Sequence, residues 1–266
     1  MTQDIWTLLG PGALRSDRER LLALRLGTMP YQEARRLQQG LAAARAAGDL
    51  PRDVLLLLEH PHTYTMGRLT PDHHIRWSRE ELAARGIALH TVDRGGLATY
   101  HGPGQLVGYP IVHLKERGLK VTQYVARLEE ALVNLLAELG IPAHREEGRR
   151  GVWTAGGKIA AIGIRCSRWV TSHGFALNVN TDLALFQGIV PCGLPHEPVT
   201  SVVQEGVEGF TASSLQGAAA RHVAVALDYA AVEEAPSPFT SSGAVQEAPS
   251  PFKASAAGLP GPASRA

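Results

Sequence analysis

A cysteine in a turn and a lysine at the start of an apolar segment are the two side chains most suited to covalent chemistry. Cys192 lies between Pro191 and Gly193, which places it in a turn. A thiol attacks as its thiolate, and with an ordinary pKa of about 8.5 it needs a nearby cation at neutral pH. Lys158 precedes an apolar run at 159–164. If partly desolvated, it can act as that cation or as a base.

Each of these residues also has a plainer interpretation. Cys192 can be a buried structural cysteine, as Cys166 is expected to be within its apolar segment. Lys158 can sit at the solvent-facing end of a strand. The two positions are far apart in sequence, so only the fold can bring them together.

A glycine-rich stretch forms a third candidate for chemistry. It places arginine, threonine, tyrosine and histidine among four glycines within 94–105. Glycines let a ligand approach the backbone closely, and exposed N–H groups can bind a carbonyl, carboxylate or phosphate. A tight turn is the alternative, but this concentration of functional side chains favours a ligand site.

The sequence offers little support for metal or serine-hydrolase chemistry. Its candidate metal ligands, His60, His62, His73, His74 and His101, match no recognised zinc spacing. No Gly-x-Ser-x-Gly motif is present. We therefore expect no metal and no cofactor.

Composition narrows the class of protein. The 266 residues carry a net charge of +1, which argues against nucleic-acid or membrane binding as the main role. Only two cysteines are present, no signal peptide is evident, and the longest strongly apolar run, 54–58, is too short to span a bilayer. We expect a cytoplasmic protein with reduced thiols.

The hydrophobic pattern predicts a mixed fold. Helical spacing covers 31–47 and 122–139, and a final helix is expected over 212–230. Short strands are expected at 54–58, 87–92 and 105–114, and antiparallel hairpins at 151–154, 158–166 and 169–179. Helices and strands do not alternate regularly. We therefore expect an α/β (α+β) fold with a mixed, largely antiparallel sheet and packed helices.

The final segment differs in composition from the rest. It is rich in Ala, Pro, Ser and Gly and repeats Glu-Ala-Pro-Ser-Pro-Phe at 234–239 and 247–252. Such a segment has too little apolar surface to offset the entropy of ordering it. We predict one catalytic domain over 1–232 and a disordered tail over 233–266.

Five collinear motifs resemble the lipoyl(octanoyl) transferases, which move an octanoyl group from acyl carrier protein to a lysine of lipoate-dependent proteins. The motifs are Leu-Glu-His-Pro with Tyr-Thr-Met-Gly-Arg at 58–68, the glycine-rich stretch at 94–105, Gly-Val-Trp with Lys-Ile-Ala-Ala-Ile-Gly at 151–163, His-Gly-Phe-Ala-Leu-Asn at 173–178, and Pro-Cys-Gly with Val-Thr-Ser at 191–201. They span about 53–201, and the tail is not part of the pattern.

The resemblance implies a fold like the catalytic module of biotin and lipoate protein ligases. It implies that Cys192 is the acyl-thioester nucleophile and that Lys158 lowers its pKa or takes its proton. The implied walls of the acyl site are Arg94, Gly95, Gly96, Leu97, Ala98, Thr99, Tyr100, His101, Ala161, Ile162, Gly163, Gly174, Phe175 and Ala176.

The resemblance also implies partners. The donor would be octanoyl-acyl carrier protein, and the acceptors would be lipoyl domains of 2-oxoacid dehydrogenases and the glycine cleavage H protein. Exchange between thioesters needs no ATP, and splitting the transfer into two steps is covalent catalysis. Glycine-loop N–H groups can hold the oxyanion, and His101 can assist proton transfer.

A basic region is a candidate docking face for an acidic carrier, with an ordinary solvated surface as the equal alternative. It comprises Arg145, Arg149, Arg150, Lys158, Arg165 and Arg168. Two rival functions remain open. One is an ATP-dependent lipoate or octanoate ligase, which needs no cysteine. The other is a non-catalytic binder of lipoyl domains.

Overall fold

The computed structural model describes residues 17–68, 70–190 and 197–235. Its centre is a seven-stranded sheet in the order β10-β1-β2-β6-β9-β8-β7. In chain order these strands are β1 (Arg20–Thr28), β2 (Val54–Glu59), β6 (Gln105–Ile111), β7 (Val152–Thr154), β8 (Gly157–Ser167), β9 (Val170–Asn178) and β10 (Ala231–Ala235). The three strands β10, β1 and β2 run parallel to one another, and every other neighbouring pair is antiparallel.

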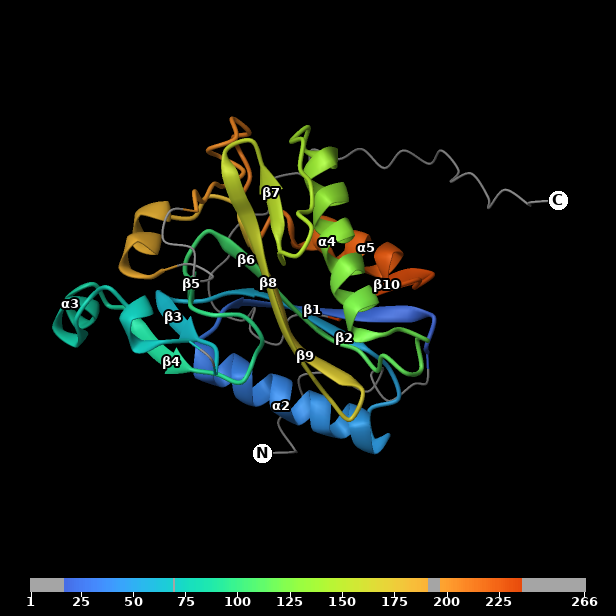
Figure 1. Cartoon of the computed structure of the whole chain (residues 1–266). Coiled ribbons are helices and arrows are strands. Elements are labelled where there is room, and N and C mark those ends of the chain that lie inside the picture. Colours follow the sequence, from blue (N-terminus) through green and yellow to red (C-terminus); the bar gives the residue numbers. More distant parts are fainter. Residues whose placement is uncertain (1–16, 69, 191–196, 236–266) are drawn as a thin grey trace.

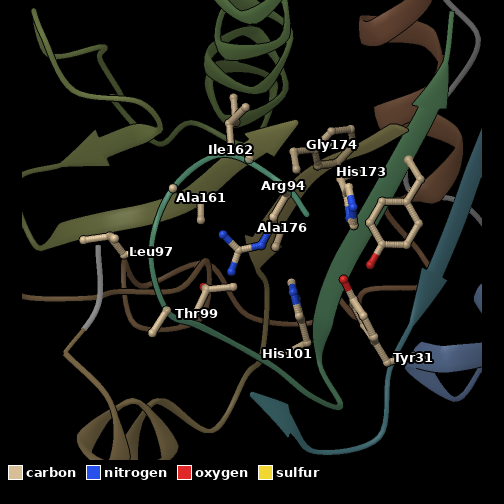
Figure 2. A pocket seen from close by; sticks show the side chains of 15 residues that line it. Tyr31, Arg94, Leu97, Thr99, His101, Ala161, Ile162, His173, Gly174 and Ala176 are labelled. Atoms are coloured by element: carbon tan, nitrogen blue, oxygen red, sulfur yellow. The ribbon is translucent and has the colours of Figure 1, made fainter. Parts of the chain in front are cut away.

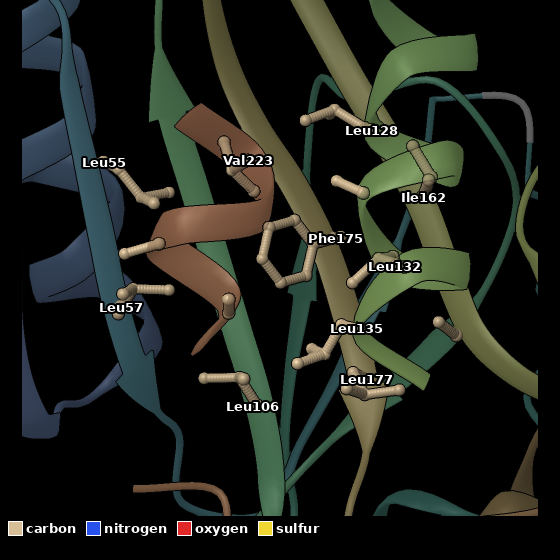
Figure 3. Close-up of a cluster of buried hydrophobic side chains, with 14 of the residues drawn as sticks. Leu55, Leu57, Leu106, Leu128, Leu132, Leu135, Ile162, Phe175, Leu177 and Val223 are labelled. Atoms are coloured by element: carbon tan, nitrogen blue, oxygen red, sulfur yellow. The ribbon is translucent and has the colours of Figure 1, made fainter. Parts of the chain in front are cut away.

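Helices cover both faces of this sheet (Figure 1). On one face, α4 (Val121–Glu138) and α5 (Gln216–Ala226) pack over the largest apolar cluster, which includes Leu132, Phe175 and Val223 (Figure 3). On the other face, α2 (Tyr31–Ala47) buries Ala34 and Leu41 against β1, β2 and β6. Because β2 lies between the two clusters, all of its first five residues are apolar and fully buried.

A second sheet has three strands, which are β3 (Thr63–Met66), β4 (Ala88–Thr91) and β5 (Thr99–His101) in chain order. They lie side by side in the order β4-β3-β5. The helix α3 (Arg79–Ala84) precedes β4 and begins with a capping box between Ser78 and Glu81. Two 3₁₀ helices, η2 (Asp72–His74) and η3 (Leu183–Gly188), complete this region. Its own apolar cluster joins Tyr64, Tyr100 and Phe186.

The structure confirms the expected mixed, largely antiparallel sheet with packed helices. The predicted helix at 31–47 has those bounds, and the one at 122–139 is shifted by one residue. The final helix is shorter than the expected 212–230. Hydroxyl hydrogen bonds between Thr211 and Ser214 form a turn before it, and Asp228 adopts a left-handed conformation after it.

The predicted tail begins too early, because 233–235 belong to β10. This strand is held by parallel pairing with β1 and by ion pairs that join Glu233 to Arg52 and Glu234 to Arg25. Main-chain pairing and charge therefore order a segment that its low apolar content suggested would be disordered. The rest of the predicted tail, 236–266, lies outside the described residues. Within the described ranges, no helix is long and apolar enough to cross a membrane.

Candidate active site

A cavity lies on the α2 side of the sheet, where the facing positions of β8 and β9 carry only small residues. In the strand register, Ala161 pairs with Ala176 and Gly163 with Gly174. The cavity and the open solvent at its mouth together hold about 470 Å³ of space that protein atoms do not fill. Side chains alternate between the faces of a strand, and the larger Ile162 belongs to the opposite face, under α4 (Figure 3). Small side chains on one face therefore leave room for a ligand.

Most of the predicted wall residues border this cavity, and Figure 2 shows several of them around the same space. Those that border it are Arg94, Gly96, Leu97, Ala98, Thr99, His101, Ala161, Ile162, Gly163, Gly174, Phe175 and Ala176. The ring of Phe175 belongs to the core under α4, so this residue reaches the cavity through its main chain.

Two predicted wall residues do not border the cavity. The Gly95 N–H donates to the carbonyl of Ile164 at 3.0 Å and so joins the loop to β8. Because this N–H is occupied, it cannot also stabilise an oxyanion. Tyr100 is fully buried beside Tyr64 and Phe186, in the core of the smaller sheet. It packs there, its hydroxyl lies 2.8 Å from His62 Nδ1, and its carbonyl accepts from Gln105 Nε2.

The loop from Arg94 closes over the cavity because several bonds tie it to β3. The Arg94 Nη2 donates to both the carbonyl and the hydroxyl oxygen of Thr65, at 3.0 and 2.8 Å. A Cβ on Gly67 would lie 2.0 Å from the Gly96 carbonyl oxygen, so these two backbone segments touch only because Gly67 has no side chain. Gly96 itself has a φ of 83°. Glycines from two predicted motifs, at 58–68 and 94–105, thus allow the two backbone segments to touch.

A run of side-chain amides sets the tautomer of His101. The Asn178 Nδ2 donates to the Thr200 carbonyl at 3.0 Å, which leaves Asn178 Oδ1 to accept from Gln105 Nε2, also at 3.0 Å. Gln105 Nε2 donates to the Tyr100 carbonyl as well, so its Oε1 faces His101 Nδ1 at 2.8 Å and accepts from it. His101 therefore carries its proton on Nδ1, and Nε2 holds a lone pair.

Burial keeps the histidines around the cavity neutral. Desolvation lowers the pKa of fully buried His101 well below its ordinary value, and lowers the pKa of His60 to about 4. The His60 Nδ1–H donates to the Met29 carbonyl, and its Nε2 accepts from the Tyr109 hydroxyl at 2.8 Å. These imidazoles are therefore hydrogen-bonding groups of fixed orientation at neutral pH.

Three cavity residues were missing from the predicted walls, although His173 falls within a quoted motif. Tyr31 begins α2, Tyr109 lies on β6, and His173 lies on β9 with a φ of 57°. The Tyr31 hydroxyl is buried and has no hydrogen-bond partner within the described residues. Burial raises its pKa to about 12. Aromatic residues on helices and strands look like core residues in the sequence, so only the fold reveals these positions.

Lys158 borders an adjoining second cavity at the start of β8. The two cavities share Thr99, Ala161 and Ala176 as wall residues, so they lie next to each other. Lys158 is 6% exposed, and its Nζ lies 4.7 Å from the ring centre of Trp153, a cation–π distance. The expected desolvation of this lysine is therefore present, and the solvent-facing alternative is wrong.

Cys192 lies outside the described residues, so its contact with Lys158 stays a prediction. The chain that follows is tied directly to the lysine. The Lys158 N–H donates to the Pro198 carbonyl at 2.9 Å, and the Thr200 N–H donates to the Lys158 carbonyl at 3.0 Å. This pairing brings a segment only a few residues after Cys192 to Lys158.

The basic region is largely neutralised by ion pairs. Arg145 pairs with Glu129, Arg149 with Glu146 and Glu197, and Arg165 with Asp93. A docking role would therefore rest on the exposed side chains of Arg150 and Arg168. Across 17–68, 70–190 and 197–235, no group of three or more His, Cys, Asp or Glu side chains is placed to hold a metal ion.

Comparison with known proteins places the chain among lipoate-attaching enzymes. A family model described as the lipoyl protein ligase A/B catalytic domain matches residues 30–224. An octanoyltransferase of Geobacter metallireducens is 49% identical over 177 residues, covering 66% of this chain and 79% of the relative. An octanoyltransferase of Mycobacterium tuberculosis is 47% identical over 220 residues, covering 82% and 91%.

Solved structures agree on the fold. A lipoate-protein ligase A bound with ATP gives a TM-score of 0.63 at 18% identity, covering 82% of this chain and 88% of that one. A bipartite lipoate protein ligase of Thermoplasma acidophilum gives 0.61 at 20% identity, covering 82% and 86%. The expected lipoate-ligase-like fold is confirmed.

Proposed function

Because the chain belongs to the family of the lipoyl protein ligase A/B catalytic domain, we propose that it transfers an octanoyl group through a thioester on Cys192. Membership of this family and the octanoyltransferase relatives make it an acyltransferase of protein lipoylation. The proposed details are the donor, octanoyl-acyl carrier protein, the acceptors, the thioester and a cytoplasmic location.

The observation that carries this proposal is that the cavity bordered by Lys158 and the cavity beneath the loop at 94–101 adjoin at shared wall residues. Small residues on β8 and β9 give them an apolar floor suited to an alkyl chain, and the buried lysine lies at one end. An acyl chain in this space would have its reactive carbonyl near Lys158 and its methyl end toward Tyr31 and Tyr109.

In the first step, the Cys192 thiolate attacks the carbonyl of the donor thioester. The bond from the carbonyl carbon to the carrier sulfur breaks, and the carrier sulfur takes the proton that Lys158 holds and leaves as a thiol. Lys158, as a cation, stabilises the attacking thiolate, or as an amine takes its proton. A thioester is exchanged for a thioester, so ATP is not needed.

In the second step, the ε-amine of an acceptor lysine attacks the enzyme thioester. The carbon–sulfur bond breaks, an amide forms, and the proton lost by the amine passes by way of Lys158 to the Cys192 sulfur. The proposed acceptors are lipoyl domains of 2-oxoacid dehydrogenases and the glycine cleavage H protein. Formation of the more stable amide drives the transfer.

His101 is a secondary candidate for proton transfer. Its Nε2 lone pair is available, but burial holds its pKa well below 6.5, and it borders the acyl cavity instead of the lysine cavity. We therefore assign proton transfer first to Lys158. The hypothesis for His101 fails if His101→Gln transfers octanoyl groups at the rate of the unchanged protein.

The experiment that tests the proposed function follows octanoyl transfer from carrier protein to an isolated lipoyl domain without ATP. We expect transfer by the unchanged protein and none by Cys192→Ser or Lys158→Met. Cys166→Ser is the matched control and should retain transfer, since Cys166 lies in β8 at the far end from Lys158. A strict ATP requirement, with Cys192→Ser still active, would favour the ligase alternative. Binding without transfer would favour the non-catalytic one.

A further inference from the structure

Glu205 joins the two chain segments that lie on either side of Lys158. One segment is the turn between β7 and β8, which contains Thr154 and leads into Lys158. The other is 198–200, which pairs with Lys158 through its main chain. The position of the lysine therefore depends on how these two segments are held together.

The Glu205 carboxylate accepts a hydrogen bond from each segment at the same oxygen. The Thr154 hydroxyl donates to Oε1 at 2.8 Å, and the Thr200 hydroxyl donates to it at 2.7 Å. Both threonines are buried, whereas Glu205 is half-buried and approaches them from the surface. Hydrogen bonds to a charged acceptor are among the stronger ones in proteins.

The turn itself is shaped to receive this carboxylate. A Cβ on Gly156 would lie 2.3 Å from Glu205 Oε1, and a Cβ on Gly157 would lie 2.4 Å from the Pro198 carbonyl oxygen. The Gly156 N–H donates to the Thr154 hydroxyl oxygen at 3.1 Å. The glycine pair thus allows the turn, the 198–200 segment and the carboxylate to meet at close range.

The same threonine also connects Lys158 to the acyl cavity. The Thr200 carbonyl accepts from Asn178, the first of the amides that lead to His101. A shift of Thr200 would therefore act directly on Lys158, to which its main chain is bonded, and only through Asn178 and Gln105 on His101.

We propose that Glu205 is a positioning residue, which holds Lys158 in its catalytic position by accepting hydrogen bonds from Thr154 and Thr200. This inference rests on the proposed function. The property of Glu205 that matters is its ability to accept hydrogen bonds, not its charge, because both donors are neutral hydroxyls. A glutamine, whose amide oxygen can accept both, should therefore replace it.

The test measures the rate constant for loading of an octanoyl group onto the full chain from octanoyl carrier protein, without ATP, in a single turnover. We expect Glu205→Ala to load at least about tenfold more slowly, since small misplacements of catalytic groups reduce rates strongly. The half-saturating donor concentration should change less than about twofold, because the acyl cavity itself keeps its walls. Glu205→Gln should load within about threefold of the unchanged protein. Glu208→Ala, an exposed glutamate in the same loop, is the control.

Loading by Glu205→Ala at the unchanged rate would overturn the proposal. Equal slowing of Glu205→Gln and Glu205→Ala would overturn it too, because charge would then be the cause. If Glu205→Ala does not fold, Thr200→Val removes one of the two donors and should slow loading by itself. An unchanged rate in Thr200→Val would likewise contradict the proposal. Failure of the unchanged protein to load refutes the proposed function instead.

Discussion

Ala176→Val should shift the preferred acyl chain toward shorter lengths. Ala176 faces Ala161 across β8 and β9 in the wall that the two cavities share, where the proposed acyl chain would pass from one to the other. Two added methyl groups would narrow this passage, while valine remains well suited to a strand. The methylenes of a long chain beyond the passage would lose their contacts, whereas a short chain would not reach it.

The expected size of this effect follows from apolar burial. Each methylene buried contributes about 0.8 kcal/mol, so loss of two to three methylene contacts costs about 2 kcal/mol. This corresponds to about a thirtyfold loss in kcat/KM for the octanoyl donor. For the butyryl donor, kcat/KM should change by less than about threefold, because the same relation between energy and rate applies to a chain that loses few contacts.

The assay compares kcat/KM for butyryl, hexanoyl and octanoyl donors in each variant. Ser172→Val is the matched control, because it adds apolar volume to the same strand outside the cavity residues. Equal losses for all three donors in Ala176→Val would refute the assignment of this passage to the acyl chain, as would an unchanged preference for octanoyl.

Three further predictions concern the lysine, the buried histidines and the core. Gly151→Ala should slow transfer at least about tenfold, because the new Cβ would lie 2.7 Å from Lys158 Cε. Burial lowers the pKa values of His60 and His173 to about 4, so their contribution to stability is complete above pH 6.5 and is lost as the pH decreases toward 4. Urea titration should therefore show that the free energy of unfolding falls by roughly 4 kcal/mol between pH 7.5 and 5. Asp53→Ala should lower the free energy of unfolding by about 3–5 kcal/mol while leaving transfer per folded molecule unchanged.

Each of these predictions has a result that would contradict it, and the first also has a control variant. Gly140→Ala also places a side chain at a positive φ, 77° against 138° at Gly151, but in open space, so it should leave transfer intact; equal effects of both would implicate backbone strain. A flat stability profile down to pH 5 would contradict the neutral histidines. The Asp53 carboxylate accepts from Arg45 at 2.8 Å and from Tyr229 at 2.6 Å, and unchanged stability would contradict that network.

The elements that the sequence predicted share a strong local pattern. The helix at 31–47 and the strand at 54–58 have clear periodicity or an unbroken apolar run, and both form as expected. The strand β10 was missed because it is stabilised by pairing with β1 and by distant arginines. Those partners are determined by the fold, and composition alone pointed to disorder.

The candidate site was also predicted only in part from the sequence. Motifs in the sequence located the loop at 94–101 and Lys158, and both border the two adjoining cavities. The sequence did not show that Tyr31 from a helix and Tyr109 from a strand would meet there. It also could not show that Tyr100, within the same motif as His101, would turn into a different core. Tyr100 and His101 are neighbours on β5, where side chains alternate between the two faces, and this strand was not predicted from the sequence.

The most direct test of the central claim is intact-mass measurement of the protein after incubation with octanoyl carrier protein, without ATP. A gain of one octanoyl group is predicted, which should be located on Cys192 by peptide mapping and should be lost when a lipoyl domain is added. No mass gain in the unchanged protein, or the same gain in Cys192→Ser, would contradict the account.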